Sequence, residues 1–306
     1  MEDYPKTLLD FEQRFGTDEA CAEYLLRLRW SEGFRCPRCG HLEAWHIRRG
    51  LYKCVHCRFE TSITAGTIFQ DTKKPLRLWF RAIWHLTSQK YGANALGLKR
   101  VLDLGSYETA WTWLHKLRRA MVRPGRDRLS GTIQVDEIYV GGEKKGKRGR
   151  GAAGKALVVI MVELKEGKTA RIRLKRVPDA SGPSLEGIIK ESVESGSTVQ
   201  TDGWGGYGRL SELGYIHKVI RKDATVGINV LPKVNRIASL LKQWLLGTYQ
   251  GGVQFSHLDY YLDEYTFRFN RRTSRSRGKL FYRLVEQALA IDPVPGHNLR
   301  AGSATP

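Results

Sequence analysis

Four cysteines arranged as two close pairs constrain this chain more than any other feature of its sequence. Cys36 pairs with Cys39 and Cys54 pairs with Cys57, and fourteen residues separate the two pairs. Each pair lets two thiolates reach one metal ion from a tight turn, and two such turns complete the tetrahedron that structural zinc requires. A segment this short buries too little apolar surface to fold alone, so bound Zn²⁺ would supply folding free energy. We therefore predict a four-cysteine zinc ribbon with no open position for catalysis.

The remaining cysteine and a nearby histidine are not expected to bind metal. Cys21 has no neighbouring cysteine and lies in a helical pattern, so we expect it to pack inside the fold. His56 lies inside the second cysteine pair and is expected at the surface. In the reducing cytoplasm, paired cysteines indicate a metal site before a disulfide.

The charge balance points to a polyanionic partner. The 306 residues include 51 Lys and Arg against 31 Asp and Glu, which gives a formal charge of +20. Such a field is typical of nucleic-acid binders, although it does not separate DNA from RNA, and a merely basic protein is the alternative. The longest aliphatic run, 156–162, is too short to span a bilayer, and no secretory signal is visible. We expect a cytoplasmic protein without membrane contact.

The first 123 residues divide into two predicted parts. Residues 5–30 have helical spacing and residues 34–66 read as short strands around the cysteines, which gives an N-terminal helix and zinc ribbon over 1–70. Residues 71–123 carry three helical patterns with tight turns, and the third ends with Lys116, Arg118 and Arg119. This arrangement suits a helix-turn-helix. A helical connector that does not touch DNA explains the pattern equally well.

Beyond a linker at 123–126 the pattern becomes α/β. Strands are expected at 132–140, 156–164, 170–177, 198–201 and 215–220, and helices at 184–194, 235–246 and 258–270. The third strand alternates apolar and basic residues, which predicts one face open to solvent. We assign an α/β domain to 130–290 and a disordered tail to 291–306, where Pro, Gly and Ser are frequent.

Two basic segments are candidate DNA contacts. The glycine-rich segment 141–151 connects the first two strands of the α/β part and would lie along phosphates as an arm, unless it is an ordinary solvated loop. A second cluster follows the last of these predicted helices. The candidate DNA-binding residues are Lys144, Lys145, Lys147, Arg148, Arg150, Arg271 and Arg272.

Two aspartates in the α/β part could form a metal site. Asp136 lies within a strand that otherwise reads as buried, and Asp202 ends the fourth strand. Two such carboxylates on adjacent strands would bind Mg²⁺ or Mn²⁺. The pattern alone also allows a salt-bridged Asp136 and an Asp202 that caps a turn. Asn235 and Lys242 are seven residues apart, so they share one helical face.

The chain resembles the bacterial insertion-sequence transposases that join a zinc ribbon to a DDE-type, ribonuclease-H-like domain. The resemblance covers roughly residues 10–285. It rests on the ribbon with Thr61–Phe69, on Val135–Gly142, on Thr201-Asp202-Gly203-Trp204 with Gly206-Tyr207, on Leu240–Tyr249, and on Tyr261–Tyr265 with Phe267–Arg272.

The resemblance implies a fold, a metal site and an activity. It implies a mixed sheet with three strands followed by alternating helices and strands, in the order β-β-β-α-β-α-β-α. It makes Asp136 and Asp202 the first two ligands of the catalytic Mg²⁺ or Mn²⁺ and places a phosphate contact at Lys242. The third acidic position holds Asn235, which places the chain in the branch with Asn or His there. Glu264 is a weaker candidate for that role, and Glu137 would point to the opposite face of the strand from Asp136.

The expected function is a DNA transposase. It would cleave the element's ends and join them to target DNA by phosphoryl transfer, acting on double-stranded DNA as a homodimer associated with the nucleoid. The neutral Asn235 leaves open a catalytically inactive, DNA-binding regulator derived from a transposase. A structure-specific nuclease without the joining step is a third possibility.

Overall fold

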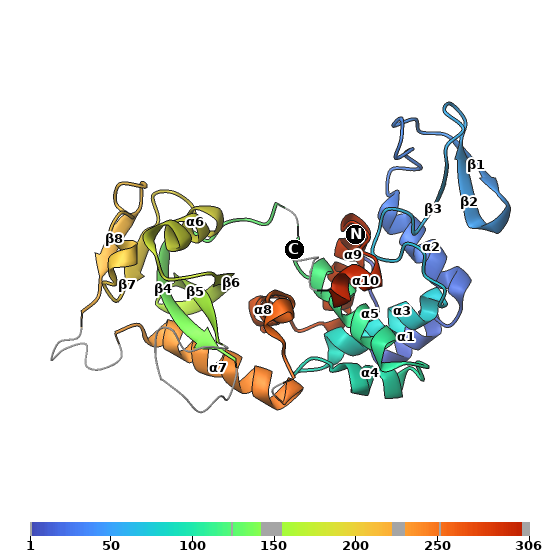
Figure 1. Cartoon of the computed structure of the whole chain (residues 1–306). Helices are drawn as coiled ribbons and strands as arrows, with labels where there is room; N and C mark the ends of the chain where they lie inside the picture. The colour runs from blue at the N-terminus through green and yellow to red at the C-terminus, as the bar shows by residue number, and fades with distance from the viewer. Residues whose placement is uncertain (1, 124, 142–154, 222–229, 251, 302–306) are drawn as a thin grey trace. The chain divides into compact units, whose positions relative to one another are not determined.

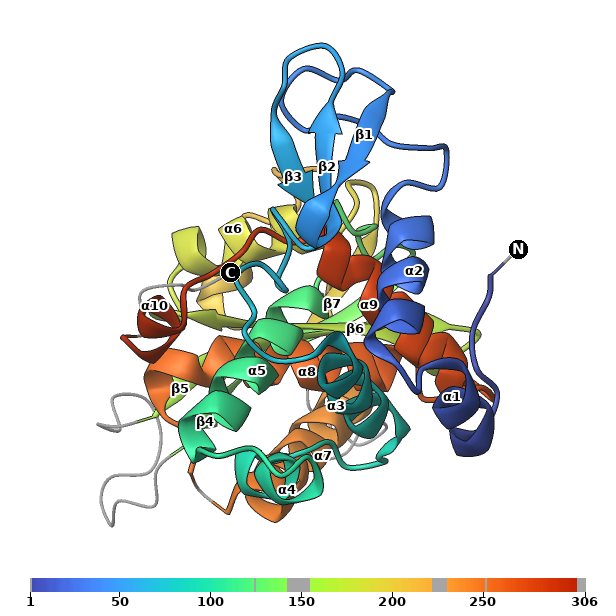
Figure 2. The ribbon, with the colours of Figure 1, turned by 90° about the vertical axis from the view of Figure 1, so that its right-hand side faces the viewer.

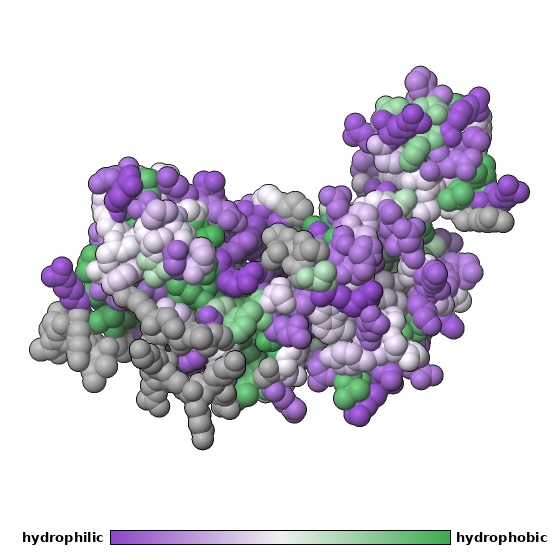
Figure 3. Space-filling model, in the orientation of Figure 1, coloured by the Kyte–Doolittle hydropathy of each residue, from purple (hydrophilic) through white to green (hydrophobic). Residues whose placement is uncertain are grey.

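The computed structural model describes residues 2–123, 125–141, 155–221, 230–250 and 252–301. It forms two compact units, which Figure 1 shows and which we treat separately. The first unit combines the N-terminal residues up to 124 with residues 274–304, and the second spans 125–273. Hydrophilic residues cover most of the visible face of both units (Figure 3), as the composition requires. No helix among the described residues has the length and apolar character needed to cross a membrane.

The ribbon is a small antiparallel sheet, as the cysteine pattern predicts. Its strands are β1 (Ala44–Ile47), β2 (Leu51–Cys54) and β3 (Glu60–Ser62), with β2 in the centre. Figure 2 shows this sheet as a separate layer of the first unit. The ring of Tyr52 lies 5.0 Å from that of Trp30 and 6.1 Å from that of Phe34, so an aromatic cluster joins the ribbon to the end of the preceding helix.

The N-terminal residues form two helices where the sequence predicts one. They are α1 (Leu8–Arg14) and α2 (Asp18–Arg29). The hydroxyl of Thr17 accepts a hydrogen bond from the amide of Ala20 at 3.2 Å, so Thr17 is the N-cap at which the second helix begins. Both helices pack on the same core, so their apolar spacing continues across the break. The sequence pattern therefore does not show where one helix ends and the next begins.

Three helices follow the ribbon, as predicted: α3 (Leu76–Ser88), α4 (Ala95–Val101) and α5 (Tyr107–Ala120). The basic end of α5 is largely held inside the unit. Arg118 is 1% exposed and contacts His115 Nδ1 at 2.8 Å, while Lys116 donates to the carbonyl of Ile68 and Arg119 to that of Asp292. These contacts favour the connector interpretation of residues 71–123, and DNA contact by this segment stays a prediction.

The C-terminal helices belong to the first unit, which differs from the sequence-based division. Helix α9 (Arg277–Ala290) packs against α2, α3 and α5 (Figure 2), and the ring of Phe281 lies within 6 Å of those of Phe11, Phe15 and Phe80. A side chain at Gly278 would meet the carbonyl of Pro5. The mixed-sheet unit therefore ends near residue 273 and not at 290, because this aromatic core recruits the last long helix.

The expected disorder after residue 290 is also wrong for the residues that the structure describes there. Helix α10 (Gly296–Arg300) follows α9, and Leu299 is completely buried. Arg300 forms an ion pair with Glu108 of α5 at 2.8 Å. Composition predicts disorder here, but these tertiary contacts stabilise the helix. Residues 302–306 lie outside the described part of the chain.

The second unit is built on a five-stranded mixed sheet in the order β6-β5-β4-β7-β8, which confirms the predicted layout. Its strands are β4 (Thr132–Val140), β5 (Ala156–Lys165), β6 (Lys168–Val177), β7 (Thr198–Thr201) and β8 (Ile216–Val219). The first three are antiparallel neighbours, whereas β7 runs parallel to both β4 and β8. Helix α6 (Gly182–Ser192) covers one face, and α7 (Pro232–Tyr249) with α8 (Leu258–Asn270) covers the other (Figure 1).

Two details of this unit depart from expectation. The connection from β7 to β8 holds only the short 3-10 helix η2 (Gly205–Tyr207) and turns, not an α-helix. A Cβ at Gly206 would lie 2.6 Å from the carbonyl of Ala180, so this close approach needs glycine. Strand β6 is only partly open to solvent on its basic face. Arg171 and Lys175 are half-buried, whereas Arg173 is 6% exposed and donates to the carbonyl of Asp127. Burial lowers the pKa of Arg173 to about 10.

Candidate catalytic site and metal centre

Two carboxylates lie near each other in the mixed sheet, Asp136 within β4 and Asp202 directly after the end of β7. Strands β4 and β7 are parallel, and Gln134 is opposite Gln200. Asp136 and Asp202 each follow two residues after these partners, so the same register carried forward places them side by side. The charge of Asp202 contributes to the raised pKa of Asp136, which is consistent with their proximity. The structure therefore brings together the two aspartates that the sequence singled out.

Asp136 and its neighbour Glu137 point to opposite faces of the sheet. Gln134, on the same face as Asp136, accepts a hydrogen bond from the amide of Lys233 in α7 at 3.2 Å. On the other face, the hydroxyl of Tyr207 donates to Glu137 Oε2 at 2.7 Å. Asp136 therefore faces α7, and Glu137 is held among the residues beneath α6, as the alternation of the strand predicts.

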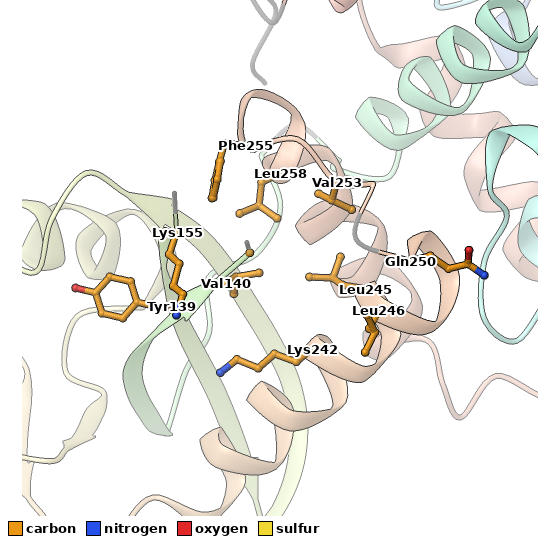
Figure 4. Close-up of a pocket in the computed structure, with 11 residues that line it drawn as sticks. Tyr139, Val140, Lys155, Lys242, Leu245, Leu246, Gln250, Val253, Phe255 and Leu258 are labelled. Carbon is orange, nitrogen blue, oxygen red and sulfur yellow. The ribbon is translucent and has the colours of Figure 1, made fainter. Parts of the chain in front are cut away.

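Helix α7 carries the other two candidate residues beside this face. The bond between Lys233 and Gln134 fixes its first turn on β4, two residues before Asn235. Asn235 and Lys242 are both exposed, and Figure 4 shows Lys242 extending from the helix toward the sheet. Gln134 and Tyr207 contact the residues of the site, although the sequence pattern indicates no role for either. Their only sequence signal is their place next to the two aspartate motifs.

Burial and negative neighbours make Asp136 hard to ionise. Burial is the largest cause, followed by the charges of Glu137 and Asp202, and together they raise the pKa of Asp136 to about 7. A divalent cation would relieve this repulsion, and the two carboxylates, with the amide oxygen of Asn235 on the adjacent α7, are the kinds of hard ligand that Mg²⁺ and Mn²⁺ prefer. The donor set therefore fits such an ion.

This raised pKa gives a pH prediction for the metal-free protein. The folded state holds a proton on Asp136 that the unfolded chain loses above pH 4, so its stability falls as the pH rises toward about 7. We expect Asp136→Asn to remove this loss and to raise the free energy of unfolding at pH 8 by about 2 kcal/mol, allowing for partial exposure.

Denaturant unfolding of both proteins between pH 4 and pH 8 measures this effect. The difference in the free energy of unfolding between variant and wild type should be absent near pH 4 and largest at pH 8. Added Mg²⁺ should stabilise only the wild type. A difference in the free energy of unfolding that does not change with pH would contradict the assignment of this titration to Asp136.

Glu264, the weaker candidate for the third ligand, is buried and paired inside the fold. Its side chain is completely buried, Oε1 pairs with Arg268 at 2.8 Å, and Oε2 accepts from the hydroxyl of Tyr249 at 3.1 Å. Both oxygens therefore have partners within the layer of α7 and α8. This arrangement favours the structural role that the helical pair with Arg268 suggests.

Removing the charge of Glu264 tests that role. Glu264→Gln leaves the guanidinium of Arg268, which is only 12% exposed, without its counter-charge. We expect a loss of about 3 kcal/mol in the free energy of unfolding. Calorimetric titration with Mn²⁺ provides the matching readout, since metal binding by the folded variant should equal that of the wild type. Loss of metal binding without loss of stability would instead make Glu264 a ligand.

The four paired cysteines converge on one point in the ribbon. All four sulfur atoms lie within 4.8 Å of one another, and Sγ of Cys36 is 3.6 Å from that of Cys57, as is Cys39 from Cys54. Tetrahedral zinc with Zn–S bonds of about 2.3 Å separates sulfurs by roughly 3.8 Å, so these spacings fit a zinc ion. This is the one group of three or more Cys, His, Asp or Glu side chains that gathers in this way within the described ranges.

Cys21 and His56 behave as the sequence predicts. Cys21 is completely buried, its thiol lies 3.9 Å from the carbonyl of Phe15, and burial raises its pKa to about 12. His56 is exposed. Neither belongs to the cysteine cluster.

The candidate DNA-binding residues fall in two groups. Lys144, Lys145, Lys147, Arg148 and Arg150 lie outside the described residues. Arg271 and Arg272 follow α8, where their guanidinium groups lie over the rings of Phe267 at 4.0 Å and Phe269 at 4.1 Å. Arg272 also donates to the carbonyls of Thr169 and Ala170 but remains exposed, so this contact orients its charge and leaves it accessible.

Comparisons with known proteins match both the ribbon and the mixed-sheet unit. Residues 16–60 match the transposase zinc-ribbon domain, and residues 128–270 match the ISXO2-like transposase domain. Together these two matches cover more than half of the chain, and they define a zinc-ribbon-containing transposase. An uncharacterized protein in the transposable element ISH50 of Halobacterium salinarum is 27% identical over 291 residues, which cover 87% of this chain and 94% of the relative. The chain belongs to the insertion-sequence transposases that join a zinc ribbon to an ISXO2-like domain.

Proposed function

We propose that this transposase cleaves the ends of its element and joins them to target DNA by metal-assisted phosphoryl transfer at Asp136 and Asp202. The observation that carries the proposal is the parallel pairing of β4 and β7, whose register reaches Gln134 and Gln200, two residues before Asp136 and Asp202. The bond from Lys233 to Gln134 supports α7 as the cover of this face. The strand order β6-β5-β4-β7-β8 agrees with the ribonuclease-H-like fold that we infer for this unit.

Each residue of the site has a distinct task. Asp136 and Asp202 would hold Mg²⁺ or Mn²⁺, with the amide oxygen of Asn235 as a neutral third ligand. When bound, these ions activate the attacking oxygen and stabilise the leaving oxygen. Lys242, two helical turns beyond Asn235, would contact a phosphate near the scissile bond and hold the strand in line. The neutral Asn235 weakens the second metal position without removing the acidic pair.

The same proposal covers the partners of the chain. Double-stranded DNA would contact the exposed Arg272, its neighbour Arg271, and the basic residues of segment 144–150 through its phosphates. Two element ends must meet for joining, so we infer a homodimer in the DNA complex. An enzyme acting on the chromosome would be associated with the nucleoid in the cytoplasm.

Cleavage of a labelled duplex that carries the element's own terminal repeat tests the proposal. We expect cutting at the repeat end with Mg²⁺ or Mn²⁺ and, with pre-cleaved ends, joining to a target plasmid. Tight binding without cutting in either metal would favour the alternative of an inactive, DNA-binding regulator, which the neutral Asn235 motivates. Cutting without joining would favour a nuclease.

A further inference from the structure

A cavity opens in the second unit beyond the acidic pair. It lies where the ends of β4 and β5 meet the last turns of α7 and the segment before α8 (Figure 4), and its volume is about 660 Å³. This volume is in the range of sites that enclose small organic molecules. Asp136, Asp202 and Asn235 do not line it, so it is distinct from the proposed metal site.

The walls of the cavity combine two kinds of chemistry. Leu245, Val253 and Leu258 form an apolar wall, whereas Lys155, just before β5, and Lys242, on α7, extend toward the same space (Figure 4). No lining residue is acidic among those that the structure describes. A ligand that matches this cavity therefore has a flat or apolar part and an anionic part.

The cavity lies at a defined distance from the acidic pair. Val140, which lines it, is four residues beyond Asp136 on the same strand, or about 14 Å at the rise of a β-strand. Lys242 is seven residues beyond Asn235, or about 10 Å along α7. One DNA strand advances about 3.4 Å per nucleotide in a duplex. The cavity is therefore about three to four nucleotides from a phosphate held at Asp136.

We propose that this cavity receives one unpaired nucleotide of the element's end, with its base against the apolar wall and its phosphate at Lys155, while Lys242 keeps the phosphate nearer the scissile bond. The proposal rests on the proposed function, because the phosphate at Asp136 sets the register of the DNA. Enzymes that do chemistry on a base hold it unstacked in an enclosing pocket, and the cost of unpairing and unstacking is smallest for a base that is already mismatched or single-stranded. An apolar peptide would fit less well, since it would cover two lysine ammonium groups without supplying an anion.

Fluorescence of 2-aminopurine in the DNA tests this proposal without requiring cleavage. The base analogue replaces one base at a time, at each of about four positions on either side of the cleavage site. The duplex carries the element's terminal repeat, and chelator keeps metal away. We expect one position to gain fluorescence about fivefold or more on binding, because its base leaves the stack. Acrylamide should quench that signal less than it quenches the free, unpaired base.

Two matched variants of α7 separate the cavity from general effects of charge. Leu246 lies at the cavity and is 67% exposed, whereas Leu240 is 37% exposed on the same helix and does not line it. Both tolerate a polar side chain without loss of core. We expect Leu246→Glu to abolish the fluorescence gain at DNA concentrations that saturate binding, and Leu240→Glu to retain it. A mismatch at the responding position should tighten wild-type binding by about tenfold.

The outcomes distinguish this inference from the proposed function. If the DNA binds and no position gains fluorescence, or if both variants retain the gain, the cavity does not take a nucleotide, whether or not cleavage occurs. If the gain appears and depends on Leu246 while metal-dependent cleavage is absent, the nucleotide site stands and the proposed catalysis fails.

Discussion

Alanine in place of Asp136 or Asp202 is expected to abolish metal-dependent strand cleavage, with a loss of at least about 10³-fold in rate. In the proposed site each carboxylate would supply a ligand charge that no neighbour replaces, because Glu137 points to the other face toward Tyr207 and Glu264 is paired inside the fold. Removing one electrostatic group from a preorganised site costs about 10² to 10³-fold, and loss of the ion adds to this.

The two aspartates should act as one unit. The double variant Asp136→Ala with Asp202→Ala is expected to be no slower than either single variant, because either change already removes the metal site. Asn235→Ala should cost less, about 10-fold to 10²-fold, since it removes a neutral ligand. Cleavage rates in Mg²⁺ and Mn²⁺, with DNA binding measured in parallel, provide the readout.

Glu137→Gln is the matched control for these variants. It removes the same charge from the next residue of the same strand and retains a group that can accept from Tyr207. We expect its cleavage rate to stay within about 10-fold of wild type, as for a residue outside the reacting groups. If Glu137→Gln abolished strand cleavage and Asp136→Ala retained it, the assignment of the two faces of β4 would be wrong.

Removal of zinc is expected to unfold the ribbon while the mixed-sheet unit remains folded. The ribbon has three short strands and little enclosed apolar surface, so its stability depends on the bound ion. Structural zinc contributes about 10 to 16 kcal/mol of apparent binding free energy in small domains. Cys54 is completely buried at the cluster, and Cys54→Ser removes one of four thiolates.

Metal analysis and amide hydrogen exchange measure this effect. Wild type should carry one zinc per chain, and Cys54→Ser or a strong chelator should remove it and expose the amides of β1 to β3. Cys21→Ser is the control, because Cys21 lies outside the cluster and should leave the zinc content unchanged. Retention of a full equivalent of zinc and of ribbon protection by Cys54→Ser would contradict the four-thiolate site.

Local signals let the sequence predict much of this molecule. Cysteine spacing determines the ribbon because metal geometry acts over a few residues, and the cluster of four sulfurs has the expected form. Strand alternation places Asp136 and Glu137 on opposite faces, and the long apolar run of β5 predicts a central strand. These features depend on residues that are neighbours in the chain, so pattern and periodicity are sufficient.

Only the tertiary structure decided the features that depend on distant residues. The parallel pairing of β4 with β7 brings Asp136 and Asp202 together, and Arg118 and Arg173 are buried although their charge suggests exposure. The packing of α9 into the N-terminal unit, around Phe281, likewise cannot be predicted from the local sequence pattern. The sequence thus determined the residue types, the local elements and the zinc ligands. Long-range packing determined which charges are buried and which carboxylates meet, because these depend on contacts between segments far apart in the chain.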